Sequence, residues 1–349
     1  MEFLFEYGLF LAKAITFVIT VVAVLITIIA LTSKQKSKKG ELEITDLSEQ
    51  INDTKKSITE QLLTPAQLKV KQKEDKKALK IEQKQEKEFA KKGNNSAIKS
   101  QLFVIDFKGS IDAKEVTSLR EEVTAILSVA SESDEVFVRL ESGGGMVHGY
   151  GLAASQLQRL KDKKIPLTIS VDKVAASGGY MMACVADKII AAPFSIIGSI
   201  GVIAQIPNFN KLLKKHDVEF EQLTAGQYKR TLTMFGENDD LGREKFKQEL
   251  EETHQLFKHF VSEHRPQLNI EKIATGEHWY GTQAIDLKLI DVIQTSDDYL
   301  LEHVDAKHIV QVQYQKSKKL SEKIGKSVAL SVESSLLNIM QTNISRMFK

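Results

Sequence analysis

Strand-like and helix-like segments alternate along residues 101–191. Of all the features of the sequence, this alternation excludes the most fold classes. The run QLFVIDFKG at residues 101–109 has the apolar, β-branched character of a buried strand. Residues 112–130 then carry apolar side chains at helical spacing, with Asp112 as the predicted N-cap. The pattern repeats with a strand at 135–142, a helix at 147–161, a strand at 166–175 and a short helix. The sequence therefore predicts an α/β fold with a largely parallel sheet and right-handed crossovers.

Further elements follow the alternating region. They are a helix near 208–216, a strand at 218–226, a long amphipathic helix over 240–264, and a helix leading to a strand within 276–293. Residues 301–349 hold the strand-like HIVQVQYQ and a last apolar stripe at Val332, Leu336, Ile339 and Met340. That stripe predicts a packing or subunit contact.

The N-terminal segment is strongly apolar. Residues 14–31 contain no charged side chain, and with the residues before them they are long enough to cross a hydrocarbon core as a helix. Glu2 and Glu6 replace the basic start of a cleaved signal peptide. We therefore predict an uncleaved single-pass anchor over residues 1–32, in contact with membrane lipid. Lysines follow the span, so the positive-inside rule places the C-terminal part in the cytoplasm.

Charge and cysteine usage exclude several functions. Residues 33–99 are rich in Lys and Glu, which predicts a solvated helix or a disordered tether.

Over the whole chain, 48 basic residues against 46 acidic ones leave a net charge of +2, so no nucleic-acid partner is expected. Cys184 is the single cysteine, so the chain alone can form neither a disulfide nor a cysteine-based zinc site. We expect no metal and no cofactor.

Ser177 lies in the stretch DKVAASGGYMMACVADKI, between two alanines and two glycines, where a strand gives way to a helix. A serine hydroxyl becomes a nucleophile when it is exposed on a turn, near converging backbone amides and within reach of a base. The small neighbours meet the first two conditions. The alternative is that Ser177 only caps a helix.

A second glycine cluster, ESGGGM at residues 141–146, ends the preceding strand. Active sites of parallel sheets lie at such strand ends, so both turns are predicted to face one polar cavity. Two bases remain open for it. His148 follows the glycines directly, and Lys229 follows a glycine turn in LTAGQYKRTLTMFGEN. Lys229 would accept a proton only when neutral, whereas the neighbouring Arg230 stays charged.

Together these residues resemble the S49 peptidase family, the group of signal peptide peptidase A, and in particular its smaller membrane-anchored members. The family pattern ASGGYY is matched at 176–180, with Met181 in place of the second tyrosine, and SPGG corresponds to SGGG at 142–145. The family lysine motif G-x-Y/H-K is matched by the residues ending at Lys229. The motif GSIGV occurs at 198–202.

The resemblance implies a Clp-protease/crotonase-like fold over residues 100–300 and a Ser/Lys dyad. The implied roles are Ser177 as nucleophile, Lys229 as general base and acid, Ser199 as the residue that orients Lys229, and Gly178 with Gly145, or alternatively Gly144, as oxyanion donors. No histidine occurs between Tyr180 and Phe209, where a Clp protease would place its base. This absence favours the dyad.

The implied protein is a serine endopeptidase of the bacterial inner membrane that cleaves unfolded or membrane-released peptides. Family relatives act outside the cytoplasm, so a periplasmic catalytic domain stays open beside the cytoplasmic one that the charge rule favours. Family members assemble as rings in which neighbours contribute to a site, so a homo-oligomer is expected. Two alternatives stay open: a crotonase-like acyl-CoA or thioester enzyme, and a non-catalytic anchored scaffold. The expected domains are an anchor (1–32), a tether (33–99), the peptidase domain (100–300) and a C-terminal extension (301–349).

Overall fold

The computed structural model describes residues 2–32, 40–71, 73, 76–77, 80–81, 84 and 100–315. Helix α1 (Glu2–Thr32) belongs to one compact unit, and a second unit, Leu42–Gln315, contains the β-sheets. No helix of the described residues combines the length and hydropathy that a membrane crossing requires. The anchor therefore stays a prediction. The apolar stripe at 332–340 and part of the predicted tether lie outside the described residues.

The main sheet of the described chain has seven strands in the order β1-β10-β2-β3-β4-β6-β9. Its strands are β1 (Glu41–Asp46), β2 (Gln101–Lys108), β3 (Glu135–Glu141), β4 (Leu167–Val171), β6 (Lys188–Ala191), β9 (Val292–Ile293) and β10 (His308–Gln315). The pairs from β10 through β2, β3, β4 and β6 to β9 are all parallel. The predicted α/β class with a largely parallel sheet is confirmed.

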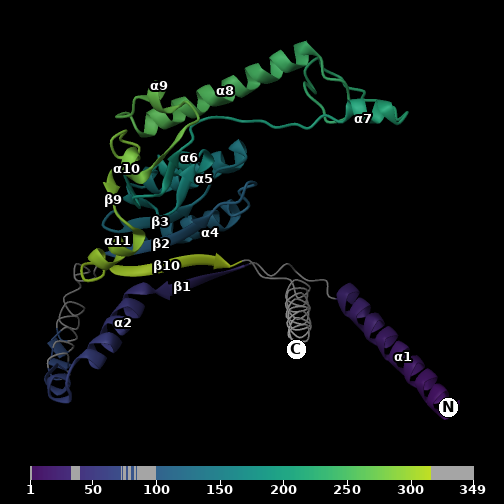
Figure 1. Cartoon of the computed structure of the whole chain (residues 1–349). Coiled ribbons are helices and arrows are strands. Elements are labelled where there is room, and N and C mark those ends of the chain that lie inside the picture. The colour runs from purple at the N-terminus through teal and green to yellow at the C-terminus, as the bar shows by residue number, and fades with distance from the viewer. Residues whose placement is uncertain are drawn as a thin grey trace, which may run out of the picture. The chain divides into compact units, whose positions relative to one another are not determined.

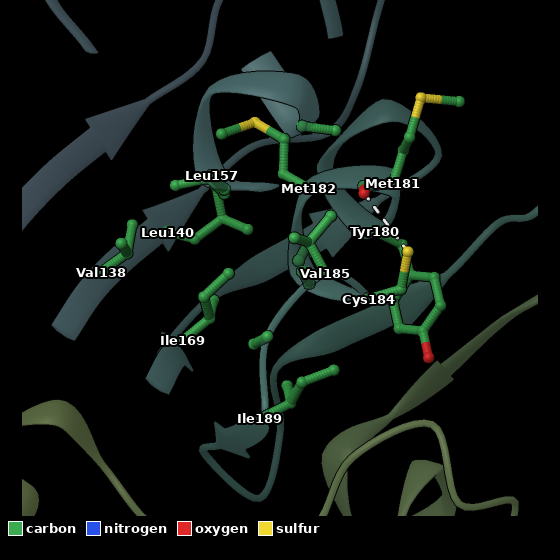
Figure 2. Close-up of a cluster of buried hydrophobic side chains, with 14 of the residues drawn as sticks. Val138, Leu140, Leu157, Ile169, Tyr180, Met181, Met182, Cys184, Val185 and Ile189 are labelled. Atoms are coloured by element: carbon green, nitrogen blue, oxygen red, sulfur yellow. Dashed lines mark hydrogen bonds between the residues drawn. The ribbon is translucent and has the colours of Figure 1, made fainter. Parts of the chain in front are cut away.

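Helices cover both faces of this sheet, and alternate residues of each strand supply the two cores. On one face lie α4 (Val116–Leu127), α5 (Val147–Asp162) and α6 (Gly178–Ala183), and on the other α2 (Leu47–Leu62) and α11 (Ser296–His303) (Figure 1). Figure 2 shows the core beneath α6, where Met182 and Val185 meet side chains of β3, β4 and α5. This packing holds α6 against the sheet. Elements β1, α2 and β10 lie outside residues 100–300 yet belong to the same unit.

A second, three-stranded sheet consists of β5 (Val174–Ala176), β7 (Ile196–Gly198) and β8 (His278–Tyr280). The sequence predicted one strand over residues 166–175, whereas the chain leaves the main sheet after β4 and enters the small sheet as β5. Asp172 lies at this break and accepts hydrogen bonds from the Ser296 backbone amide at 2.8 Å and hydroxyl at 2.6 Å. These bonds to the start of α11 replace strand pairing.

Residues 202–239 form an excursion, here named the arm, that carries α7 (Asn210–Lys215) and leads into α8 (Asp240–His264). In Figure 1 the chain leaves the domain after β7, reaches α7 and returns along α8. The bounds predicted for α8 are confirmed, but the strand predicted at 218–226 is wrong. That segment has no regular structure, and its apolar Val218 and Phe220 are exposed. It pairs with no strand of the described chain.

The C-terminal end of α8 is fixed by an ion pair whose arginine is buried. Arg265 is 3 % exposed and donates to both carboxylate oxygens of Asp291 at 2.9 Å and to the Lys288 carbonyl. Helices α9 (Ile270–Ile273) and α10 (Gly281–Ala284) complete this part of the fold. The pair holds α8 against the loop that enters β9.

The N-cap predicted for the first helix is wrong. Helix α4 begins at Val116, with Glu115 in the cap position, and Asp112 instead accepts a hydrogen bond from the Ser110 hydroxyl at 2.6 Å. Glu115 also accepts from Ser110, from its amide at 3.0 Å and its hydroxyl at 2.7 Å. Both carboxylates therefore hold the loop after β2 in place.

Glu122 on α4 gives the fold a pH dependence. Its side chain is 4 % exposed, accepts from the Tyr314 amide, and burial raises its pKa from 4.5 to about 7, with the Asp106 charge adding to the rise. A raised carboxyl pKa contributes stability that is fully present below pH 4.5 and is lost as the pH rises through about 7. We expect the free energy of unfolding to fall by about 2 kcal/mol between pH 5 and 8, relative to Glu122→Gln.

Urea unfolding of wild type and Glu122→Gln at both pH values checks this prediction. Glu121→Gln is the matched control, because Glu121 is the exposed neighbour on the same helix. Equal pH dependence in wild type and Glu122→Gln would contradict it.

Candidate active site

Ser177 lies at a sharp turn between β5 and α6. Its backbone has φ of +52° and ψ of −119°, an unfavourable conformation for a residue with a side chain. Two hydrogen bonds hold it: the Ser177 amide donates to the Gly198 carbonyl at 2.8 Å, and the Met181 amide donates to the Ser177 carbonyl at 3.0 Å. The structure thus places the half-buried serine on the strand-to-helix turn that the sequence indicated.

The glycine turn after β3 lies directly beside this serine. The Ser142 amide donates to the Val174 carbonyl at 2.8 Å, and the Ala176 amide donates to the Ser142 carbonyl at 3.0 Å. These bonds bring the turn against β5. A Cβ atom on Gly144 would lie 2.7 Å from the Gly178 nitrogen and 2.8 Å from the Ser177 Cβ. Only a glycine at 144 allows the two turns to approach this closely.

Hydrogen bonding distinguishes between the amides of the glycine turn. The Gly144 amide donates to the Ser142 hydroxyl at 3.1 Å, and the Met146 amide donates to the Ile111 carbonyl at 2.8 Å. Within the part of the chain that the structure describes, the amides of Gly145 and Gly178 have no acceptor. Unpaired amides that line one cavity with a serine are suited to hold an oxyanion. The geometry favours Gly145 over Gly144 as the partner of Gly178.

A small cavity of about 20 Å³ opens beside Ser177. Its lining residues are Gly145, Val147, Ser177, Gly178, Met181, Gly201, Val202, Thr253 and Phe257. Ser177 and the backbones of Gly145 and Gly178 give it a polar wall, and apolar side chains from α5, α6 and α8 lie opposite. A space of this size admits little more than one water molecule, so it can take only a small group of a bound substrate.

Ser199 lies next to Ser177 through the small sheet. Strands β5 and β7 are parallel and pair Ala176 with Gly198, so the two serines follow paired positions. Ser199 also has a positive φ of +52°, and its amide donates to the Glu277 carbonyl at 2.6 Å. The structure therefore brings together Ser177, Ser199 and the three glycines of the predicted site.

Lys229 is not part of this arrangement in the described chain. It lies in the arm between α7 and α8, where the neighbouring Tyr228 ring faces the Lys245 ammonium at 5.5 Å. Lys245 precedes the cavity-lining Thr253 by about 12 Å along α8. Among the described residues, Lys229 makes no hydrogen bond to Ser177 or Ser199, so the dyad stays a prediction. The same holds for the alternative base, because His148 is exposed and makes no hydrogen bond to Ser177.

Sequence reasoning missed several residues at this site. Tyr150 is fully buried, and its hydroxyl lies 2.5 Å from the Ser142 hydroxyl and donates to the Ser110 carbonyl at 2.9 Å. A tyrosine on the buried face of α5, soon after the glycines, was the available signal. Thr253 and Phe257 reach the cavity from α8, and no local pattern links that helix to Ser177.

Comparison with known protein families and proteins shows similarity over most of the chain. The model of the family described as "Peptidase family S49 N-terminal" matches residues 2–157, and the model described as "Peptidase family S49" matches residues 159–309. A probable protease SohB of Haemophilus influenzae is 54% identical, over 97% of this chain and 96% of that protein. Proteins of the same name from two Buchnera aphidicola subspecies are similar as well. The protein of subspecies Schlechtendalia chinensis is 52% identical, over 86% of this chain and 99% of that protein. The protein of subspecies Acyrthosiphon pisum is 51% identical, over 97% of this chain and 98% of that protein.

Proposed function

Because the chain belongs to peptidase family S49 and is a peptidase, we propose that it is a serine endopeptidase in which Ser177 is the nucleophile and Lys229 the general base. The strained turn at Ser177, in one cavity with Gly145 and Gly178 and their unpaired amides, carries this proposal. The relatives' name, probable protease SohB, supports the same class of reaction.

The proposed reaction is acyl transfer. Neutral Lys229 takes the Ser177 hydroxyl proton as the serine oxygen attacks the peptide carbonyl carbon, and the two amides hold the resulting oxyanion. The lysine then returns its proton to the leaving amine, which leaves an acyl ester on Ser177. Water, activated by the same lysine, hydrolyses that ester. Ser199, adjacent to Ser177, would orient the amine by accepting a hydrogen bond from it.

The position of Lys229 in the arm makes a second copy of the chain part of the proposal. Since the lysine is remote from Ser177 along α8, we infer that it completes the site of a neighbouring protomer in a homo-oligomer. Exposed apolar side chains along the arm support this inference, because such surfaces on soluble domains mark contacts. They include Ile203, Leu212, Phe220, Leu223, Tyr228 and Phe235. Enclosure by a neighbour would also favour the neutral amine.

The N-terminal segment supports a place at the bacterial inner membrane. The absence of charge in residues 14–31 motivates an anchor there, and the lysines that follow favour a cytoplasmic catalytic unit. An anchored ring would receive unfolded or membrane-released peptides.

A fluorophosphonate probe tests nucleophile and location together. Cells that express the full chain are labelled, separated into membrane and soluble fractions, and the adduct is mapped by peptide mass spectrometry. We expect a single adduct on Ser177, in the membrane fraction. An adduct on another serine, or none, would refute the assigned nucleophile, and labelled chain in the soluble fraction would refute the anchor. Peptide and acyl-CoA substrates assayed in parallel separate a peptidase from a crotonase-like enzyme.

A further inference from the structure

Tyr150 contacts both turns that carry the proposed oxyanion donors. Its ring packs against α6 so closely that a Cβ atom on Gly178 would overlap ring carbons. Its hydroxyl reaches the opposite turn, at 2.5 Å from the Ser142 hydroxyl. Tyr150 is fully buried and Ser142 is 1 % exposed, so water does not compete for these bonds.

The hydrogen-bond directions along this chain of groups follow from counting protons. The Tyr150 hydroxyl donates its single proton to the Ser110 carbonyl at 2.9 Å, so toward Ser142 it acts as the acceptor. The Ser142 hydroxyl therefore donates to Tyr150, and its own oxygen accepts the Gly144 amide at 3.1 Å. Burial raises the pKa of Tyr150 above its ordinary value, so the phenol stays protonated.

The consequence lies in which amide remains free. Because the Ser142 hydroxyl accepts from the Gly144 amide and the Ile111 carbonyl accepts from the Met146 amide, the Gly145 amide between them is left without an acceptor in the described part of the chain, and Gly145 lines the cavity beside Ser177. Without the Ser142 hydroxyl in its present orientation, the Gly144 amide would be released and the turn could rotate. The Ser110 end of the chain is itself fixed by Glu115 and Asp112.

We propose that Tyr150 is a positioning residue that sets both oxyanion donors at once, holding the Gly145 amide in place through Ser142 and the Gly178 amide through its ring. This inference rests on the proposed serine peptidase mechanism. Removing the hydroxyl leaves the ring, so it affects the Gly145 side alone.

The test compares Tyr150→Phe, Ser142→Ala and the double variant in the full-length chain. A misplaced oxyanion donor weakens the enzyme's interaction with the transition state more than its interaction with the bound substrate. We therefore expect kcat to fall about 10- to 100-fold and KM to stay within about threefold of the wild-type value. Because both hydroxyls act in one chain of bonds, the double variant should resemble either single variant. Tyr299→Phe is the matched control, since Tyr299 is also buried and also bonds through its hydroxyl, to Glu135 and Thr168, but does not line the cavity.

Two readouts separate the possible failures. Hydrogen exchange of a peptide covering residues 143–149 should be faster in Tyr150→Phe and unchanged in Tyr299→Phe. A kcat for Tyr150→Phe equal to that of Tyr299→Phe, or unaltered exchange, overturns the role of Tyr150 while wild-type labelling at Ser177 upholds the peptidase. Absence of labelling in wild type instead overturns the mechanism and this inference with it. If Tyr150→Phe does not fold, Ser142→Ala decides by the same criteria.

Discussion

A mixture of chains carrying Ser177→Ala and chains carrying Lys229→Ala is expected to show peptidase activity that neither variant shows alone. Loss of the base should lower kcat about 10²- to 10⁴-fold, and loss of the nucleophile should lower it by up to about 10⁶-fold. In a mixed assembly, a Lys229→Ala chain supplies Ser177 and its neighbour supplies Lys229. Of the four neighbour arrangements one is productive, so equal co-expression should restore about one quarter of wild-type activity.

Two further variants make this result specific to proton transfer by Lys229. Lys229→Arg keeps the positive charge but cannot accept a proton, so it should be as inactive as Lys229→Ala. Arg230→Ala removes the adjacent cation and should remain active. An inactive mixture of the two inactive variants would show that Lys229 acts within its own chain, which requires the arm to fold back. An active Lys229→Ala variant would exclude the dyad.

The elements that the sequence predicted well are those whose own residues determine their packing. Helix α8 was predicted with its observed bounds because charged residues cover one side of it and a narrow apolar stripe, with Phe257 and Val261, packs on the domain. Strands β2 and β3 are buried along most of their length and carry runs of consecutive apolar side chains, as expected for strands covered on both faces.

The elements that were predicted wrongly depend on distant partners. Residues 218–226 have strand-like composition, but a strand also needs a neighbouring strand, and the described part of the chain offers none beside the arm. The split between β4 and β5 depends on Ser296, which is far along the sequence from Asp172.

The site shows the same division. Ser177 and the glycines were found because a strained turn needs small residues close by in sequence, and the structure agrees with that placement. Choosing Gly145 over Gly144 required hydrogen bonds that sequence spacing does not contain. Tyr150 was missed because its ring contacts one turn, at Gly178, and its hydroxyl contacts another, at Ser142. From the sequence alone, Tyr150 cannot be distinguished from an ordinary core residue.

Gly144→Ala is expected to lower kcat about 10²- to 10³-fold, the effect of losing one oxyanion donor. The Gly144 φ of +87° is unfavourable for alanine, and the new Cβ would lie 2.7 Å from the Gly178 nitrogen, so the two turns must separate. Gly143→Ala is the matched control in the same turn, because a Cβ there meets no atom within 4 Å. Its kcat should stay within about twofold of wild type, as expected for an open surface position.

Steady-state kinetics and the rate of probe labelling at Ser177 measure both effects. A loss confined to Gly144→Ala, with the thermal midpoint close to that of Gly143→Ala, ties activity to the distance between the two turns. Equal kcat in the two variants would show that the distance between the two turns does not affect the reaction. That result would contradict the proposal that amides from both turns hold the oxyanion together.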